Sequence, residues 1–194
     1  MTRIGLFGGT FNPIHIGHLA VAQTARETMK LDKVIFIPSN WPPHKNTDTL
    51  ALAKHRFGMV RLAIKDNPHF AISDFEIRRQ EKSYTIDTLK HFCRVLPRDS
   101  KLFFIIGGDT LAHLKDWRYI DDILKIVTFI VANRPGQFKK NLGMKIRYHA
   151  ITMQGIDISS SYVRQRIAQG KTAKYYVQDS ILGYIKRHHL YQKS

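Results

Sequence analysis

Two histidines follow a glycine pair in the segment Gly8–His18, which reads GGTFNPIHIGH. Glycines directly after a strand let a phosphate approach the backbone closely. His15 and His18 are three residues apart, so both project from one face if a helix begins there. The first amides of a helix lack backbone partners and its dipole favours an anion, so the segment predicts a polyphosphate site. Neither the pattern G-x-G-x-x-G nor the eight-residue P-loop pattern occurs in it.

A second segment, Ile158–Arg164, is rich in hydroxyl groups. Ser159 is placed to cap a helix, and hydroxyls at a helix start also bind phosphate oxygens. Arg164 follows one turn later, where its guanidinium can reach the same anion. Taken alone, each segment also fits a simpler interpretation, in which the histidines cap or pack and Ser159 is an ordinary cap beside an exposed arginine.

The charge of the chain also favours anionic ligands. It has 31 Lys and Arg against 15 Asp and Glu, a net charge of +16. Of these side chains, 12 basic and 2 acidic ones lie in residues 134–194. Such a field attracts nucleotides, nucleic acid or anionic lipid, although a basic surface that serves only solubility explains it equally well.

The first residues contain no long apolar stretch, and the longest apolar runs, such as Val127–Ala132, are too short to span a membrane. The single cysteine, Cys93, excludes a disulfide within the chain and is expected to be buried in a helix. We therefore expect a cytoplasmic protein with no membrane partner.

Apolar runs alternate with helical periodicity along most of the chain. Strands are expected at residues 4–7, 33–38, 70–77, 102–106, 127–132 and 147–153, and helices at 16–30, 51–65, 85–96, 162–169 and 177–187, with a short helix ending at 115. This alternation predicts an α/β fold with a doubly wound, mainly parallel sheet and helices on both faces. We expect one domain over residues 1–194, helical from about residue 159.

Ligands of such folds bind at the carboxyl ends of the strands. Four segments directly follow expected strands: Gly8–Gly9, the loop 39–50, Gly107–Asp109 and Arg134–Gly136. They should therefore meet at one edge of the sheet. The composition of the loop 39–50 also permits it to close on a substrate.

The segment His15–His18 matches the H/T-x-G-H signature of the nucleotidyltransferase superfamily, and Ile158–Arg164 resembles its I-S-S-T-x-x-R signature. Further segments are similar to those of bacterial nicotinate-nucleotide adenylyltransferases, in the same order: Pro42–Lys45, Ser83–Leu89, Ile106–Leu111, Leu114–Trp117 and Arg134–Gly136. This resemblance implies a Rossmann-like fold. It also implies that ATP, with Mg²⁺, reacts with nicotinate mononucleotide to give deamido-NAD and pyrophosphate.

The reaction needs no protein nucleophile, so catalysis should consist of positioning and electrostatic stabilisation. We expect His15, His18 and Arg164 to be the catalytic residues, with His18 at the α-phosphate. The expected ATP-binding residues are Gly8, Gly9, Thr10, Phe11, His15, Gly17, His18, Gly107, Asp109, Ile158, Ser159, Ser160 and Arg164. No set of protein ligands for a metal is apparent, so Mg²⁺ should be held mainly by water and substrate oxygens.

The acceptor nucleotide has its own expected residues. Lys45 is expected on a substrate phosphate, Trp117 on the pyridine ring and Asp109 on ribose hydroxyls. By resemblance, Tyr84 and Thr85 read the nicotinate carboxylate, and Arg134 is a further candidate. Each has a simpler alternative: a solvated lysine for Lys45, core packing for Trp117 and a helix cap for Asp109.

Two positions depart from the family pattern: Asn12 stands where an aspartate is usual, and Ser161 where a threonine is usual. Asn12 keeps the turn-forming capacity and loses the charge. Related acceptors, nicotinamide mononucleotide or phosphopantetheine, remain alternatives, although Ser83–Leu89 and Trp117 argue against phosphopantetheine. A nucleic-acid-binding module would use the basic, tyrosine-containing tail but leaves both histidines unexplained, so no nucleic acid partner is expected. A homo-oligomer remains possible.

Overall fold

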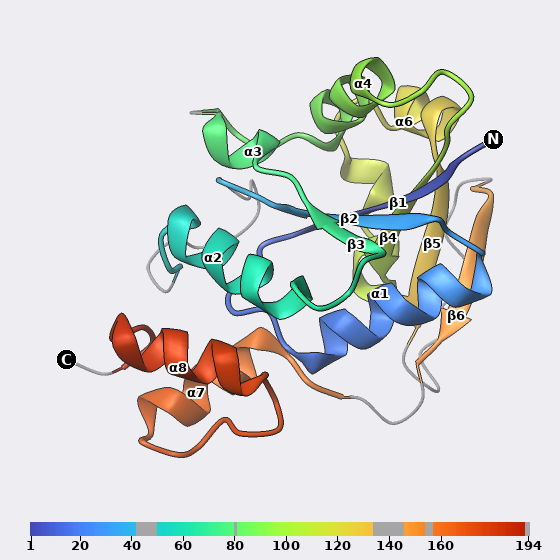
Figure 1. The fold of residues 1–194 in the computed structure, drawn as a ribbon. Helices are drawn as coiled ribbons and strands as arrows, with labels where there is room; N and C mark the ends of the chain where they lie inside the picture. Colours follow the sequence, from blue (N-terminus) through green and yellow to red (C-terminus); the bar gives the residue numbers. More distant parts are fainter. Residues whose placement is uncertain (42–49, 80, 134–145, 154–156, 193–194) are drawn as a thin grey trace.

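A computed structural model of the chain describes residues 1–41, 50–79, 81–133, 146–153 and 157–192. Six strands form one sheet in the order β3-β2-β1-β4-β5-β6, and every neighbouring pair is parallel (Figure 1). The strands are β1 (Arg3–Gly9), β2 (Lys33–Pro38), β3 (Phe70–Ile72), β4 (Lys101–Gly107), β5 (Thr128–Asn133) and β6 (Tyr148–Thr152). The order reverses between β1 and β4, as in doubly wound folds.

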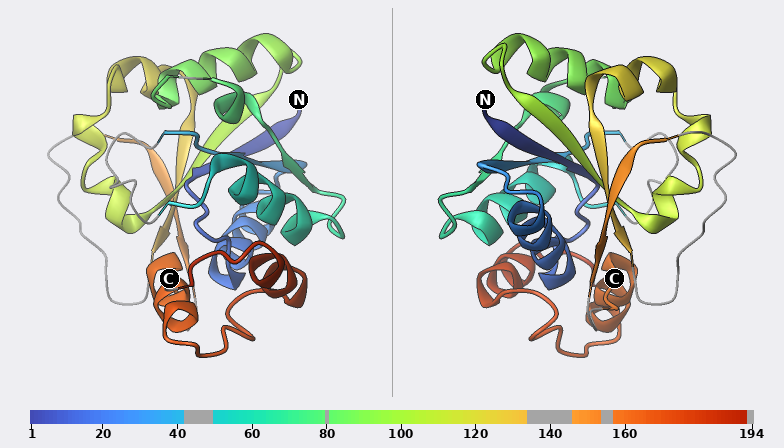
Figure 2. Two further views of the ribbon diagram at one scale, coloured as in Figure 1. Left: turned by 90° about the vertical axis from the view of Figure 1, so that its left-hand side faces the viewer. Right: turned by 90° about the vertical axis from the view of Figure 1, so that its right-hand side faces the viewer.

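Helices cover both faces of this sheet, which confirms the predicted Rossmann-like α/β fold (Figures 1 and 2). One face carries α1 (Ile16–Thr28), α2 (Ala53–Ile64), α7 (Ser160–Ala168) and α8 (Asp179–Arg187). The other carries α4 (Thr85–Val95), α5 (Gly108–Leu111), the 3-10 helix η1 (Leu114–Asp116) and α6 (Ile120–Ile126). A single helical turn, α3 (Phe75–Arg78), follows β3.

Each face of the sheet has its own apolar core because successive strand residues point to opposite sides. In β2, Val34 and Phe36 pack into the core below α1 and α2, whereas Ile35 and Ile37 pack into the core below α4 and α6. All four side chains are buried. This double burial explains why the central strands are continuous apolar runs in the sequence.

Three expectations about local structure are wrong. The strand expected over residues 70–77 ends at Ile72, because the Ser73 hydroxyl accepts the Phe75 amide and a helical turn begins there. The helix α6 was not expected at all. Cys93, expected to be buried, is exposed, because the buried residues of its helix are Ile86, Thr88, Leu89 and Phe92.

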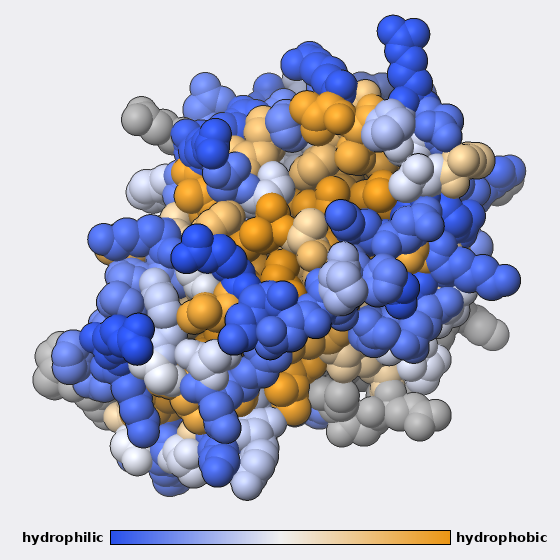
Figure 3. Space-filling model, viewed as in Figure 1, coloured by the Kyte–Doolittle hydropathy of each residue, from blue (hydrophilic) through white to orange (hydrophobic). Residues whose placement is uncertain are grey.

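The surface in the view of Figure 3 is mostly hydrophilic, with hydrophobic side chains gathered in a band across its middle. Exposed large apolar side chains occur at separate points, among them Trp41, Tyr119 and Tyr175. Within the described ranges, no helix has the length and apolar character needed to cross a membrane.

Arg56 is a fully buried cation that joins two loops and the start of α2. Its guanidinium donates hydrogen bonds to the carbonyls of Thr10 at 2.9 Å, Ser39 at 2.6 Å, Asn40 at 3.0 Å and Ala51 at 2.9 Å. Burial lowers the pKa of Arg56 to about 10, so the side chain stays charged at neutral pH. It thus ties the loop after β1 to the loop after β2 and to the start of α2.

Replacing Arg56 should therefore destabilise the protein. In Arg56→Met, four backbone carbonyls lose their donor inside the protein, and each buried group left unsatisfied costs on the order of 1–3 kcal/mol. We expect the free energy of unfolding, measured by urea denaturation, to fall by about 3 kcal/mol or more. Arg61→Met is the matched control, because Arg61 lies on the same helix and is exposed. Equal urea midpoints for the two variants would contradict this role.

Candidate active site

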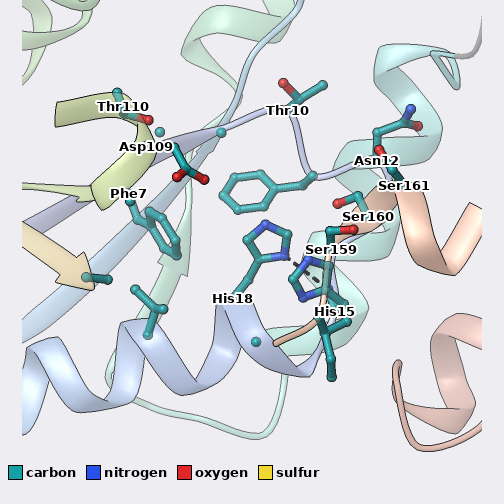
Figure 4. Close-up of a pocket in the computed structure, with 18 of the residues that line it drawn as sticks. Phe7, Thr10, Asn12, His15, His18, Asp109, Thr110, Ser159, Ser160 and Ser161 are labelled. Carbon is teal, nitrogen blue, oxygen red and sulfur yellow. Dashed lines mark hydrogen bonds between the residues drawn. The ribbon is translucent and has the colours of Figure 1, made fainter. Parts of the chain in front are cut away.

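A pocket of about 500 Å³ lies at the carboxyl ends of β1, β4 and β5, where the strand order reverses. The starts of α1, α5 and α7 also line it. Figure 4 shows His15 and His18 side by side, with Ser159–Ser161 next to His15 and with Asp109 and Thr110 across the pocket. For the described residues, the expected meeting of strand-end segments at one edge is confirmed.

The two histidines form a stacked pair at the start of α1. Their ring centroids lie 3.7 Å apart with an interplanar angle of 30°. His15 is the N-cap residue, and its backbone N–H donates to Nδ1 of His18 at 3.2 Å. Since Nδ1 accepts, a neutral His18 ring carries its proton on Nε2 and can donate it to an anion.

The glycine pair makes room for an aromatic side chain. Phe11 has a left-handed φ of 47°, and its ring turns back over Gly9. A Cβ on Gly9 would lie 2.9 Å from Cζ of Phe11. The Phe11 ring in turn packs edge-on against His18, with the centroids 5.1 Å apart. Gly9 is thus required by the packing that supports His18, whereas the sequence suggested only that it admits a phosphate.

The start of α7 is tied to the loop after β1. The predicted cap is confirmed, because Oγ of Ser159 accepts the amide of Tyr162 at 3.1 Å. Ser160 donates its hydroxyl to the Pro13 carbonyl at 2.9 Å. Arg164 donates from one terminal nitrogen to the Asn12 carbonyl at 2.8 Å and from the other to the Ser161 hydroxyl at 3.2 Å.

The opposite wall of the pocket comes from α5 and the end of β5. Gly107 is the N-cap of α5, so the alternative interpretation of Asp109 as the cap is wrong. A Cβ on Gly108 would lie 2.6 Å from Oδ1 of Asn133, which is buried and lines the pocket. Sequence reasoning missed Asn133, although its place directly after an apolar strand would have indicated it.

The expected ATP-binding residues all line this pocket. They are Gly8, Gly9, Thr10, Phe11, His15, Gly17, His18, Gly107, Asp109, Ile158, Ser159, Ser160 and Arg164. Sequence reasoning missed Leu50 and Met153 as lining residues, because their places depend on packing between distant segments. Asn12, which lies within the segment predicted to bind polyphosphate, also lines the pocket.

Of the residues expected to bind the acceptor, Asp109 lines this pocket, whereas Tyr84, Thr85 and Trp117 do not. Tyr84 is the N-cap of α4 and Thr85 its first residue. Trp117 packs edge-on against Phe104 and Phe129, with centroid distances of 5.9 and 6.2 Å. These core contacts agree with the simpler interpretation of Trp117. Lys45, Arg134 and most of the loop 39–50 lie outside the described residues.

Asp109 is the one carboxylate among the described residues that line the pocket. No group of three or more His, Cys, Asp or Glu side chains suited to a metal occurs in the described part of the chain.

Comparisons with known proteins agree with this geometry. Residues 6–166 match the model of the Cytidylyltransferase-like family, so the chain belongs to this class of nucleotidyltransferases. It is 42% identical over 191 residues to a probable nicotinate-nucleotide adenylyltransferase of Shouchella clausii, covering 98% of this chain and 97% of the relative. A protein of the same name from Bacillus pumilus is 41% identical over 192 residues, with 99% and 100% covered.

The chain thus belongs to the family of nicotinate-nucleotide adenylyltransferases. A solved structure of Plasmodium falciparum nicotinic acid mononucleotide adenylyltransferase, complexed with NaAD, has the same fold with a TM-score of 0.83. It is 22% identical, and the match covers 98% of each chain. At this identity the likeness supports the fold alone.

The start of α4 is held in place by a buried carboxyl group. Oε1 of Glu76, on α3, accepts the hydroxyl of Thr88 at 2.6 Å. Burial raises the pKa of Glu76, with the Thr88 hydrogen bond acting in the opposite direction. The folded protein therefore binds this proton more tightly than the unfolded chain does. Protonated Glu76 therefore contributes to the stability of the fold at acid pH, and this contribution is lost as the pH rises above the ordinary range of a carboxyl group.

Glu76→Gln should remove this pH dependence, because the amide keeps an acceptor for Thr88 and does not ionise. We expect the free energy of unfolding of the variant to change less than that of the wild type between pH 5 and 8, and to exceed it at pH 8. Urea denaturation across this range measures both. Glu81→Gln is the control, since the Glu81 side chain is 79% exposed. If the free energy of unfolding of Glu76→Gln changed with pH as steeply as that of the wild type, Glu76 would not be the source of this pH dependence.

Proposed function

We propose that this chain transfers the adenylyl group of ATP to nicotinate mononucleotide, giving deamido-NAD and pyrophosphate in pyridine nucleotide biosynthesis. The observation that carries this proposal is the stacked pair His15–His18, which lies next to the serine-rich start of α7 in a pocket at the switch in strand order. The likeness to relatives of that name over almost the whole chain supports the choice of acceptor. A cytoplasmic location is part of the proposal.

The mononucleotide itself supplies the nucleophile. One of its phosphate oxygens attacks the α-phosphorus of ATP, the bond to the β-phosphate oxygen breaks, and pyrophosphate leaves. Negative charge builds on the α-phosphoryl oxygens and on the leaving group. Nε2–H of His18 is the donor that we assign to the α-phosphoryl oxygen, and His15 fixes the ring of His18 through its backbone N–H and the ring stack.

Arg164 and the start of α7 are assigned to the β- and γ-phosphates. A guanidinium has five N–H donors, and the two hydrogen bonds of Arg164 to Asn12 and Ser161 leave donors for phosphate oxygens. Those two bonds orient the group before ATP arrives. The amides after Ser159 add donors at the helix start.

The remaining nucleotide contacts are assigned by position. The backbone of Gly8–Phe11, Gly17, Gly107 and Ile158 forms the walls of the pocket, and Asp109 is the acceptor for ribose hydroxyls. A Mg²⁺ ion bound with ATP would be held mainly by water and substrate oxygens, and it would neutralise part of the phosphate charge.

The acceptor nucleotide is assigned to the side of the sheet that carries α4. The first amides of α4, at Tyr84 and Thr85, are suited to the nicotinate carboxylate. The indole of Trp117 is partly exposed beside its core contacts, and we assign this exposed part to the pyridine ring. Lys45 is the candidate for the acceptor phosphate, and Arg134 is a further candidate for the acceptor.

The proposed reaction is tested by pyrophosphate release. The purified protein is incubated with ATP and Mg²⁺ and with nicotinate mononucleotide, nicotinamide mononucleotide, phosphopantetheine or no acceptor. We expect release with nicotinate mononucleotide to exceed that with any other acceptor, because the carboxylate matches the donors at the start of α4. A preference for another acceptor would overturn this choice of substrate, and no release with any acceptor would overturn the proposed reaction.

The role of His18 is tested by His18→Ala. The loss of one preorganised donor to a developing oxyanion costs about 10²–10³ in kcat, and we expect a decrease of this size in pyrophosphate release. The control is His69→Ala, which removes an exposed imidazole outside the pocket and should leave kcat at the wild-type value. A kcat for His18→Ala within about threefold of the wild type, well below that range, would refute the assignment.

A further inference from the structure

Asn12 joins three distant segments at the edge of the pocket. Its side chain is 6% exposed. Oδ1 accepts the backbone amide of Ala51 at 3.1 Å and the hydroxyl of Tyr191 at 2.8 Å. Its backbone carbonyl accepts Arg164 at 2.8 Å. The start of α2, the helix α7 and the end of the chain therefore meet on one residue of the loop after β1.

Tyr191 reaches this loop by an unusual path. The chain leaves α8 after Arg187, and both His189 and Tyr191 adopt left-handed φ angles, of 50° and 64°. Residues with a Cβ take this conformation only where surrounding contacts hold them. The Tyr191 ring packs against the core of the α1–α2 face, and its hydroxyl points to Asn12. Burial raises the pKa of Tyr191, which keeps the phenol protonated as a donor.

We infer that Tyr191 is a positioning residue for ATP, acting through the side chain of Asn12. The inference deepens the proposed function and rests on its assignment of the phosphates to this pocket. Asn12 anchors Arg164, and the next residue, Pro13, anchors Ser160. Both anchors belong to the wall that we assign to the β- and γ-phosphates. Without the Tyr191 hydroxyl, Oδ1 of Asn12 loses the donor that ties it to the end of the chain, and the loop is held less firmly.

This role of Asn12 also explains how residue 12 can act without the carboxylate of the family pattern. Among the described residues, the donors to Oδ1 are neutral groups, an amide and a phenol. An amide oxygen accepts such donors without carrying a charge. What these contacts require of residue 12 is an acceptor atom, and Asn12 supplies it where the family pattern has an aspartate.

Tyr184, on α8, offers a matched control. Its hydroxyl lies 3.1 Å from Nδ1 of His55 on α2, and the residue does not line the pocket. Tyr184→Phe and Tyr191→Phe each remove one phenol hydroxyl from the C-terminal part of the chain. Only the second removes a contact to Asn12.

The test is the affinity for a non-hydrolysable ATP analogue, measured by titration calorimetry, together with the KM for ATP. We expect Tyr191→Phe to raise the Kd for the analogue and the KM for ATP about 5- to 10-fold, because a buried acceptor at the pocket loses a donor. In the same variant, the KM for nicotinate mononucleotide should stay within about twofold of the wild-type value. In Tyr184→Phe, the Kd for the analogue and the KM for ATP should also stay within about twofold of the wild-type values. Wild-type ATP affinity in Tyr191→Phe, or an equal loss in both variants, would overturn the inference.

A second comparison tests the same inference without the single variant Tyr191→Phe, in which the hydroxyl alone is removed. Asn12→Leu removes the acceptor, and Asn12→Leu/Tyr191→Phe removes acceptor and donor together, which leaves no unpaired phenol. If Tyr191 acts through Asn12, both proteins should bind the analogue equally. Weaker binding by the double variant means that Tyr191 acts by another route and refutes the inference. Analogue binding needs no acceptor nucleotide, so its outcome is separate from a failure of the proposed reaction.

Discussion

The loop between β1 and α1 is buried, and its carbonyl groups must find donors inside the protein. Those of Thr10, Asn12 and Pro13 receive hydrogen bonds from Arg56, Arg164 and Ser160. None of these donors belongs to the sheet. The shape of the phosphate pocket therefore depends on side chains that α2 and α7 send into one short loop.

This arrangement also sets the charge of the pocket. Arg56 and Arg164 donate to backbone carbonyls, and neither forms an ion pair with a carboxylate among the described residues. Their positive charge adds to the excess of basic residues in the chain. Such a field attracts a polyphosphate before any direct contact forms.

Local patterns were sufficient to predict the strands, most helices and the histidine pair, because each depends on periodicity or on spacing within one turn. The cap at Ser159 was predictable for the same reason. Arg56 and Tyr191 were not, since their partners lie far away in the sequence and a charged or phenolic side chain gives no sign of burial. Cys93 was misjudged because helical position alone does not tell which side of α4 meets the sheet.

The contact of Tyr191 with Asn12 joins residues 179 positions apart. During synthesis, the first loop of the protein leaves the ribosome long before its last partner exists. Until Tyr191 has been made and has emerged, Oδ1 of Asn12 lacks this donor, although β1, β2 and β4 can already be present. The order of translation thus separates the folding of the central sheet from the completion of the hydrogen bonds that Asn12 makes with distant segments.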